Sequence, residues 1–206
     1  MNQKLIEKYG KKFAADKNGT PVLQGIHYAA DGSVLVTDRH RGLRIREAHS
    51  FKEPMTLHAK TGLPIDDQYP DLTKIWPNDN RAQRIVLAGS VLKNVADRLR
   101  CIADVASRLN KKLPIVTIEV SNGSAWVHVK DEDSLVQAKV FLGNTEDSKL
   151  QLNISLNAEY LYTALSLFAD ASVTELHLSL QGPLNPIYLT DNQNIDVVIL
   201  PYRINP

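Results

Sequence analysis

The chain of 206 residues has a single cysteine, few aromatic residues and almost no net charge. The lone Cys101 excludes an intramolecular disulfide framework and a zinc site built on cysteines. Because 24 basic residues balance 23 acidic ones, no global charge draws the chain to nucleic acid or to an anionic membrane, and any basic surface must be local. The sequence also lacks a secretory signal and an apolar run near the roughly 20 residues of a membrane span. We therefore expect a soluble cytoplasmic protein with no membrane partner.

Motifs of the common enzyme classes are missing as well. The sequence has no glycine-rich phosphate loop, no H-E-x-x-H and no G-x-S-x-G. Its six histidines include no pair spaced i, i+4, and Cys101 falls inside a predicted helix, where an inert thiol is the usual case. We expect no enzyme activity, no metal and no cofactor, and keep an uncharacterised enzyme only as a third alternative.

The first 80 residues predict one helix followed by strands. Apolar residues recur every three or four positions from Asn2 to about Lys17, which is typical of an amphipathic helix. Strands are predicted at 22–29, 33–37, 42–46 and 55–59. From 61 to 80 the composition shifts to glycine, proline and aspartate, so we predict an interdomain connection there. The resulting domains are 1–80 and 81–206, and the first has a sheet edge that needs a partner.

Residues 81–206 predict a duplicated unit of one strand, one helix and three strands. The helices are expected at 91–109, capped by Ser90, and at about 157–168. Each helix has one apolar face, which can be buried only against a sheet, and the strands come in hairpin-linked runs. The sequence therefore predicts an α+β fold with helices packed on antiparallel sheets.

Basic side chains gather on the outward faces of these predicted helices and just beyond them. Lysine and arginine on such faces neutralise phosphates regardless of base sequence. Asp97 and Asp104 share the outward face of the long helix, so a merely solvated face stays open as the alternative. The candidate DNA-binding residues are Lys4, Lys8, Lys11, Lys12, Lys93, Arg100, Arg108, Lys111 and Lys112.

Several short segments, spread over nearly the whole chain, match one known family in its order. They are PVLQG at 21–25, VTDRHR at 36–41, QYPDL at 68–72, NAEYL at 157–161, GPLNPIYL at 182–189 and VVILPYRI at 197–204. Together they resemble the bacterial DNA polymerase III β subunit family, the DNA sliding clamps. The resemblance implies that 81–206 corresponds to a complete third clamp domain, and that 1–80 corresponds to half of the second domain with its exit segment.

The resemblance implies a processivity factor that tethers a polymerase or other replication and repair proteins to double-stranded DNA. A clamp ring uses six domains with two helix-bearing units each, so four of these chains, with three units each, would supply all twelve. We therefore expect a homo-oligomeric ring. The alternative is a clamp-derived module that binds clamp-seeking peptides, and competes with the true clamp, without encircling DNA.

In the family, a cleft between the second and third domains binds a short linear peptide. Two departures from the family pattern occur near it: Arg39 replaces a glycine, and Gly42 stands where a leucine is expected, with Leu43 one place on. The alternative is that these residues only close the C-terminal strand against a helix. Carried over position by position, the cleft residues are Thr37, His40, Arg41, Leu43, Pro77, Asn157, Tyr160, Pro186, Tyr188, Leu200, Pro201, Tyr202 and Arg203.

Overall fold

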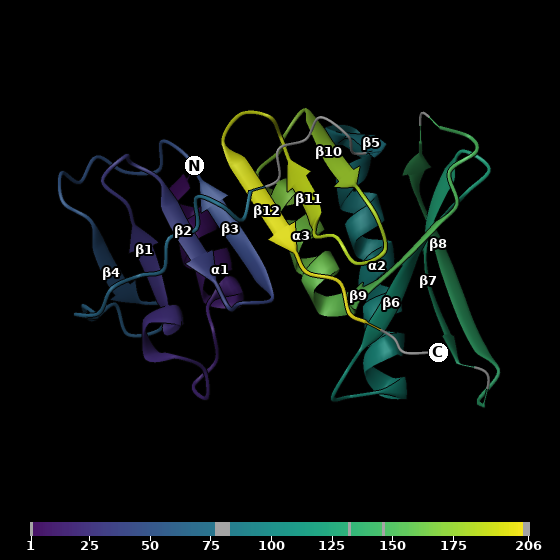
Figure 1. Ribbon diagram of the computed structural model, residues 1–206, viewed down its shortest axis with the longest axis horizontal. Helices are drawn as coiled ribbons and strands as arrows, with labels where there is room; N and C mark the ends of the chain where they lie inside the picture. The colour runs from purple at the N-terminus through teal and green to yellow at the C-terminus, as the bar shows by residue number, and fades with distance from the viewer. Residues whose placement is uncertain (1, 77–82, 132, 146, 204–206) are drawn as a thin grey trace. The chain divides into compact units, whose positions relative to one another are not determined.

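The chain forms two structural units, and the second is interrupted by a piece of the first (Figure 1). The computed structural model describes residues 2–76, 83–131, 133–145 and 147–203. The first unit comprises Met1–Pro77 with Thr190–Val198, and the second comprises Asn78–Leu189 with Ile199–Pro206. Within the described ranges, no helix is long and apolar enough to cross a membrane.

The first unit packs one helix on an antiparallel sheet. Leu5, Ile6, Tyr9 and Phe13 bury one face of the helix, as their spacing predicts, but the helix ends at Phe13 and not near Lys17. The strands run in the order β4-β1-β2-β3-β12. In chain order the elements are α1 (Asn2–Phe13), the 3-10 turn η1 (Pro21–Gln24), β1 (Gly25–Tyr28), β2 (Val34–Thr37), β3 (Arg41–Ile45), β4 (Met55–His58) and β12 (Ile195–Ile199).

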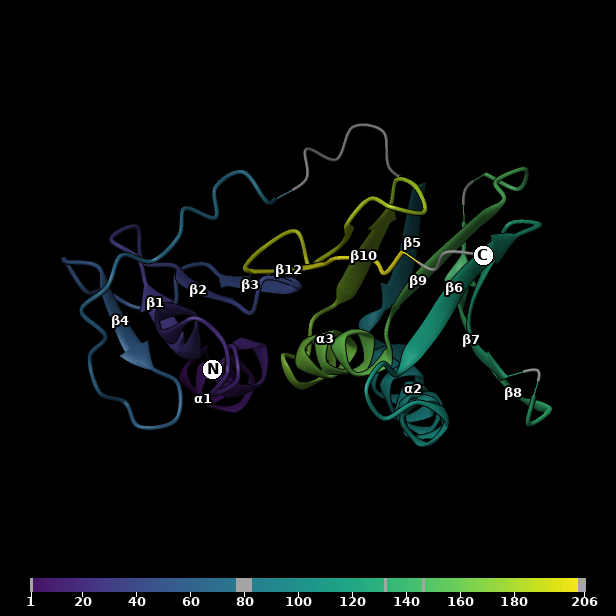
Figure 2. The same cartoon turned by 60° about the horizontal axis from the view of Figure 1, so that its bottom comes forward.

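The second unit contains two sheets, in the orders β8-β7-β6-β9 and β11-β10-β5. Its two helices pack side by side (Figure 2). With β12, the elements repeat the predicted pattern of strand, helix and three strands, which confirms the α+β class. They are β5 (Gln83–Ala88), α2 (Gly89–Leu109), β6 (Ile115–Ser121), β7 (Ser124–Asp131), β8 (Val136–Asn144), β9 (Leu152–Asn157), α3 (Ala158–Asp170), β10 (Glu175–Leu180) and β11 (Ile187–Thr190).

Alternation along β6 and β7 sets which side chains face the helices. Buried and half-buried residues alternate along both strands, so Val116, Ile118 and Val120 point inward while the residues between them face outward. The Asn-Gly dipeptide forms the hairpin turn between β6 and β7, because Asn122 and Gly123 both have positive φ, at 51° and 75°, as a type I′ turn requires. This register places a polar row on the outer face of the sheet.

The two helices of the second unit begin for different reasons. Asn157 caps α3, because its Oδ1 accepts hydrogen bonds from the backbone N–H groups of Glu159 and Tyr160. The prediction that Ser90 caps the long helix is wrong, since α2 already begins at Gly89. A Cβ at Gly89 would lie 1.8 Å from the carbonyl oxygen of Val173. The close approach of the Val173 backbone, and not a hydroxyl cap, fixes where α2 starts.

The two structural units differ from the predicted domains 1–80 and 81–206 in one segment. Thr190–Val198 joins the first unit, because Asp196 on β12 is fully buried between two arginines of that unit. Its Oδ2 lies 2.7 Å from Nε of Arg44 and 2.6 Å from an Nη of Arg46, and the Thr190 hydroxyl donates to its Oδ1. The backbone N–H of Arg46 also donates to the carbonyl of Asn194. These interactions tie β12 to β3 across 152 residues of sequence.

The first unit was expected to have a sheet edge that needs a partner, but the outer edge of β4 is already covered. The backbone N–H of His58 donates to Leu63, and that of Ile65 donates to Thr56, so residues 63–65 lie along the outer edge of β4. Pro64 sits in the middle of this segment and has no N–H to offer a further strand. Strand addition at this edge is therefore blocked.

We expect Asp196→Ala to destabilise the first unit by about 3 kcal/mol, because both arginines lose a buried counter-charge but can still reach water. Trp76 stacks on Arg44 at 4.5 Å, so urea unfolding followed by tryptophan fluorescence in a Trp126→Phe background reports on this unit. Exposed Glu53→Ala is the matched control and should change stability by less than about 0.5 kcal/mol. Equal stability of the two variants would contradict the role of Asp196.

Candidate functional site

The C-terminal segment of the second unit carries four of the predicted peptide-binding residues along the edge of β9. The backbone N–H of Tyr202 donates to the carbonyl of Ser155 over 2.7 Å, which fixes the segment beside that strand. Leu200 is 40% exposed, Pro201 and Tyr202 are half-buried, and Arg203 is exposed. An exposed leucine beside a proline gives this segment an apolar surface that a ligand can reach.

The start of α3 lies next to this segment. Asn157 follows Ser155 by two positions and serves as the helix cap, while Tyr160 is half-buried in the first turn. The structure therefore brings Asn157, Tyr160 and the segment 200–203 together at one end of β9. Asn157 is the last residue of β9 and precedes the first residue of α3, so it both caps the helix and adjoins the segment 200–203.

Pro186 and Tyr188 contribute less surface than predicted. Pro186 is half-buried immediately before β11, and Tyr188 is only 8% exposed within that strand. Strand residues packed this deeply support a neighbouring surface and offer a ligand little area of their own.

Three of the residues predicted in the first unit are buried and hold the unit together. Leu43 has no exposed surface. The Thr37 backbone N–H donates to the Tyr69 hydroxyl at 3.0 Å, and the Thr37 hydroxyl donates to the carbonyl of Arg41. The prediction that these side chains line a ligand surface is therefore not supported for Leu43 and Thr37. His40 is exposed, and Pro77 lies outside the described residues.

Arg41, also buried at 8% exposure, anchors α1 to the β2–β3 turn. Its Nε pairs with Oδ2 of Asp38 at 3.0 Å, its guanidinium lies 4.8 Å from the centre of the Phe13 ring, and Nη2 donates to the carbonyl of Lys12. The arginine fork thus meets a carboxylate, an aromatic face and a helix C-terminus at once. Its position explains why an arginine follows this turn.

The two departures from the family pattern have structural reasons. Arg39 adopts a φ of 77°, a conformation that favours glycine, and its guanidinium donates to the Thr20 hydroxyl. A Cβ at Gly42 would lie 3.0 Å from Cδ1 of Ile75 and 3.3 Å from Cγ1 of Val198. The place of the expected leucine is filled by the connection after β4 and by β12.

The predicted basic faces are exposed in both units. On α1 the side chains of Lys4, Lys8, Lys11 and Lys12 are all exposed, and the Nζ atoms of Lys8 and Lys12 lie 5.3 and 5.4 Å from the centre of the Tyr9 ring. Asp97 and Asp104 are exposed too. The exposed basic side chains of α2 and the residues after it are Lys93, Arg100, Arg108, Lys111 and Lys112.

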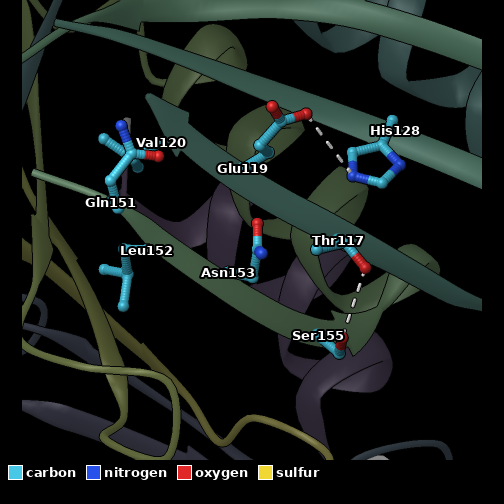
Figure 3. A pocket seen from close by; sticks show the side chains of 8 residues that line it. All are labelled: Thr117, Glu119, Val120, His128, Gln151, Leu152, Asn153 and Ser155. Carbon is cyan, nitrogen blue, oxygen red and sulfur yellow. Dashed lines mark hydrogen bonds and ion pairs between the residues drawn. The ribbon is translucent and has the colours of Figure 1, made fainter. Parts of the chain in front are cut away.

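An open depression that the sequence motifs did not indicate lies on the outer face of β6, β7 and β9 (Figure 3). Its volume is about 490 Å³. Hydroxyl groups of Thr117 and Ser155 lie 3.2 Å apart across two strands. The lining residues are Thr117, Glu119, Val120, His128, Gln151, Leu152, Asn153 and Ser155. Alternation along β6 could have predicted this polar row, but nothing in the sequence predicts a hollow there.

Charges in this depression are coupled. Glu119 pairs with Lys139 at 2.8 Å and lies 3.8 Å from Nε2 of His128. The hydrogen bond from Lys139 lowers the pKa of Glu119, so this carboxyl is ionised at neutral pH. Burial lowers the pKa of His128, against the opposing effect of Glu119. Lys139 also lies 5.1 Å from the centre of the Trp126 ring, which meets Phe141 edge-on.

In the part of the chain that the structure describes, no group of three or more histidine, cysteine or acidic residues could hold a metal ion. Cys101 is exposed on α2, where its thiol contacts the carbonyl of Asp97.

Comparisons with known proteins point to one fold. No family model matches the chain. The β sliding clamp of Bacillus subtilis is 27% identical over 144 residues, which are 68% of this chain and 35% of that protein. The solved B. subtilis clamp superposes with a TM-score of 0.75 at 17% identity, covering 99% of this chain and 63% of the clamp. A sliding clamp of Pseudomonas aeruginosa superposes with a TM-score of 0.78 at 14% identity, covering 98% of this chain and 65% of that clamp.

The chain therefore has the DNA sliding-clamp fold, and the resemblance drawn from its motifs is confirmed. It spans about a third of the curated clamp by sequence, and less than two thirds of the solved clamps by structure. The match is therefore to part of a clamp.

We expect the two neighbours of His128 to shift its pKa in opposite directions. Glu119→Gln should lower it further, because a negative charge is lost, and Lys139→Met should raise it, because a positive charge is lost and Glu119 is freed. Titration of the His128 ring signals by NMR measures both, with distant His58 as the internal reference.

The stability effect has a defined sign. Since the folded pKa of His128 lies below its unfolded value, the unfolded chain binds more protons as pH falls through that interval, and stability declines there. Shifts of the same sign in both variants would contradict the coupling.

Proposed function

We propose that this chain is a clamp-like processivity factor that tethers a polymerase, or another replication or repair protein, to DNA. The observation that carries the proposal is the clamp fold over 98–99% of the chain, together with the exposed basic side chains of α1 and α2. One solved structure with this fold is the β chain of DNA polymerase III from Streptococcus pneumoniae. A ring holds DNA by enclosure, so a near-zero net charge is compatible with this role, and the local lysines need only weak, non-specific attraction to phosphates.

The peptide site of the proposal centres on the second unit. Leu200 and Pro201 offer apolar surface beside Tyr160 that an extended ligand can cover. The exposed His40 and Arg203 are polar groups that the family pattern assigns to the same ligand. Thr37, Arg41 and Leu43 are buried within the first unit, so we assign them no contact with the peptide.

Assembly into a ring is part of the proposal. Four chains with α1, α2 and α3 each supply twelve helix-bearing units, and the expected particle has four times the chain mass of 23.0 kDa. Light scattering gives the mass, and a DNA-retention assay compares circular with linear duplexes. Retention only on circular DNA supports the ring. Peptide binding with no retention supports the competing module that does not encircle DNA.

We expect Tyr160→Ala and Leu200→Asp each to weaken binding of a fluorescent clamp-binding peptide at least tenfold, since each removes apolar contact of about 1.5–3 kcal/mol. Tyr162→Ala is the matched control, because Tyr162 lies on another face of the same helix and is also half-buried. Fluorescence anisotropy measures the affinity, and circular dichroism checks that each variant is folded. An unchanged affinity in both test variants would place the peptide elsewhere.

Replacing Lys4, Lys8 and Lys11 by glutamate should weaken DNA association and reduce the slope of log affinity against log salt by about 3, roughly one per lost phosphate contact. Peptide affinity should stay the same. The matched control replaces three exposed lysines of the same unit outside α1, namely Lys52, Lys60 and Lys74. An equal loss of DNA association in the control would show that net charge, and not the α1 face, attracts DNA.

A further inference from the structure

The first unit repeats the second in its strand order but lacks one helix. In the second unit, α2 precedes the β6-β7-β8 run, and β9 returns to pair with β6. In the first unit, α1 precedes the β1-β2-β3 run, and β4 returns to pair with β1. After β9 the chain enters α3, which packs beside α2. After β4, the described chain up to residue 76 contains no helix.

Burial differs at the equivalent positions of the two returning strands. Ile154 and Leu156, the inward residues of β9, are fully buried. Their counterparts on β4 are Met55 and Leu57, which pair with Tyr28 and Ile26. Met55 is 38% exposed and Leu57 is half-buried. The face that two paired helices cover in the second unit is thus partly bare in the first.

An aromatic cluster extends this bare face. The Tyr28 ring lies 5.2 Å from His49 and 5.5 Å from Phe51, and His49 lies 4.9 Å from Phe51. Phe51 is 45% exposed. We name Tyr28, His49, Phe51, Met55 and Leu57 the helix-side patch. Three contacting rings beside an exposed methionine form a contiguous apolar surface of the kind that marks an interface.

The flank of α1 that borders the patch carries no lysine. A Cβ at Gly10 would meet Cδ1 of Ile26 on β1, and burial, together with the charge of Glu7, raises the pKa of Tyr28. This side of the helix therefore faces β1 and the patch, and Gln3, Glu7 and Gly10 share it by their helical spacing. Lys12 lies on the opposite flank, where its carbonyl meets Arg41 at the start of β3.

The geometry points to a second copy of this chain as the occupant of the helix-side patch. Two first units related by a two-fold axis would set their α1 helices side by side along the lysine-free flanks, as α2 and α3 lie in the second unit. Each copy would supply the helix that the other lacks, and the two half-domains would complete one domain. This assembly uses helix faces, because residues 63–65 already occupy the outer edge of β4.

Charge supports a second copy over an unrelated helix. The exposed basic residues of α1 lie away from the contact, so two copies approach without opposing their lysines. This contact would be one of those between chains in the proposed ring. The number of copies rests on the proposed function.

The test measures association of the full chain alone, without DNA or peptide. Sedimentation velocity over a concentration series should show reversible association of the wild type, and the double variant Phe51→Glu/Met55→Glu should weaken it at least tenfold. Phe141→Glu is the matched control, since Phe141 is 39% exposed on the second unit. Peptide affinity in the double variant reports that the chain is folded and that the proposed function has not failed with it.

Cross-linking tests the helix pairing directly. In a Cys101→Ser background, Glu7→Cys should form a covalent dimer under mild oxidation, whereas Lys11→Cys on the outward face should not. A monomeric wild type, or a double variant that associates as well as the control, would overturn the inference. So would binding of an unrelated amphipathic helix at the patch of a chain that stays monomeric. Dimerisation through this face without DNA retention or peptide binding would overturn the proposed function alone.

Discussion

A buried carboxylate between two arginines holds the first unit together. Asp196 has no exposed surface, and Arg44 on β3 and Arg46 just after it both pair with its carboxylate. Burying an ion pair is costly unless every partner is in place, and here the Thr190 hydroxyl and the stack of Arg44 on Trp76 complete the surroundings. The interaction fixes β12 beside β3, and Gly42 leaves room for Ile75 and Val198 over the same strand. The sheet that supports α1 and its lysines depends on this arrangement.

Periodicity predicted most of the elements, because each helix and strand buries one face. The apolar spacing of α1, α2 and α3 matched their buried residues, and the turn at Asn122 and Gly123 followed from its dipeptide. The failures have local causes. Pro21 starts a 3-10 turn where a strand was expected, and the start of α2 is set by the Val173 backbone, which lies about 84 residues away in sequence and leaves no local signal.

The candidate site was predicted unevenly for the same reason. Asn157, Tyr160 and the segment 200–203 meet at one end of β9, and their motifs indicated this grouping. Thr37, Arg41 and Leu43 follow the same family pattern but are buried, because α1 and Tyr69 cover them. A motif shows which residues are present, whereas the exposure of each side chain depends on which other parts of the chain pack against it. The depression around Glu119 and His128 has no motif at all, since it arises from side chains on separate strands.

The discontinuous first unit sets an order for folding during synthesis. Residues 2–76 leave the ribosome before the second unit, yet the strand that completes their sheet is translated more than a hundred residues later. The second unit gathers most of its chain in one uninterrupted stretch and can form while translation continues, since domains generally fold as units. Until β12 is made, β3 has an open edge, and Arg44 and Arg46 lack the carboxylate of Asp196. The first unit is thus begun before the second and finished after it, and premature association between nascent chains would begin during this delay.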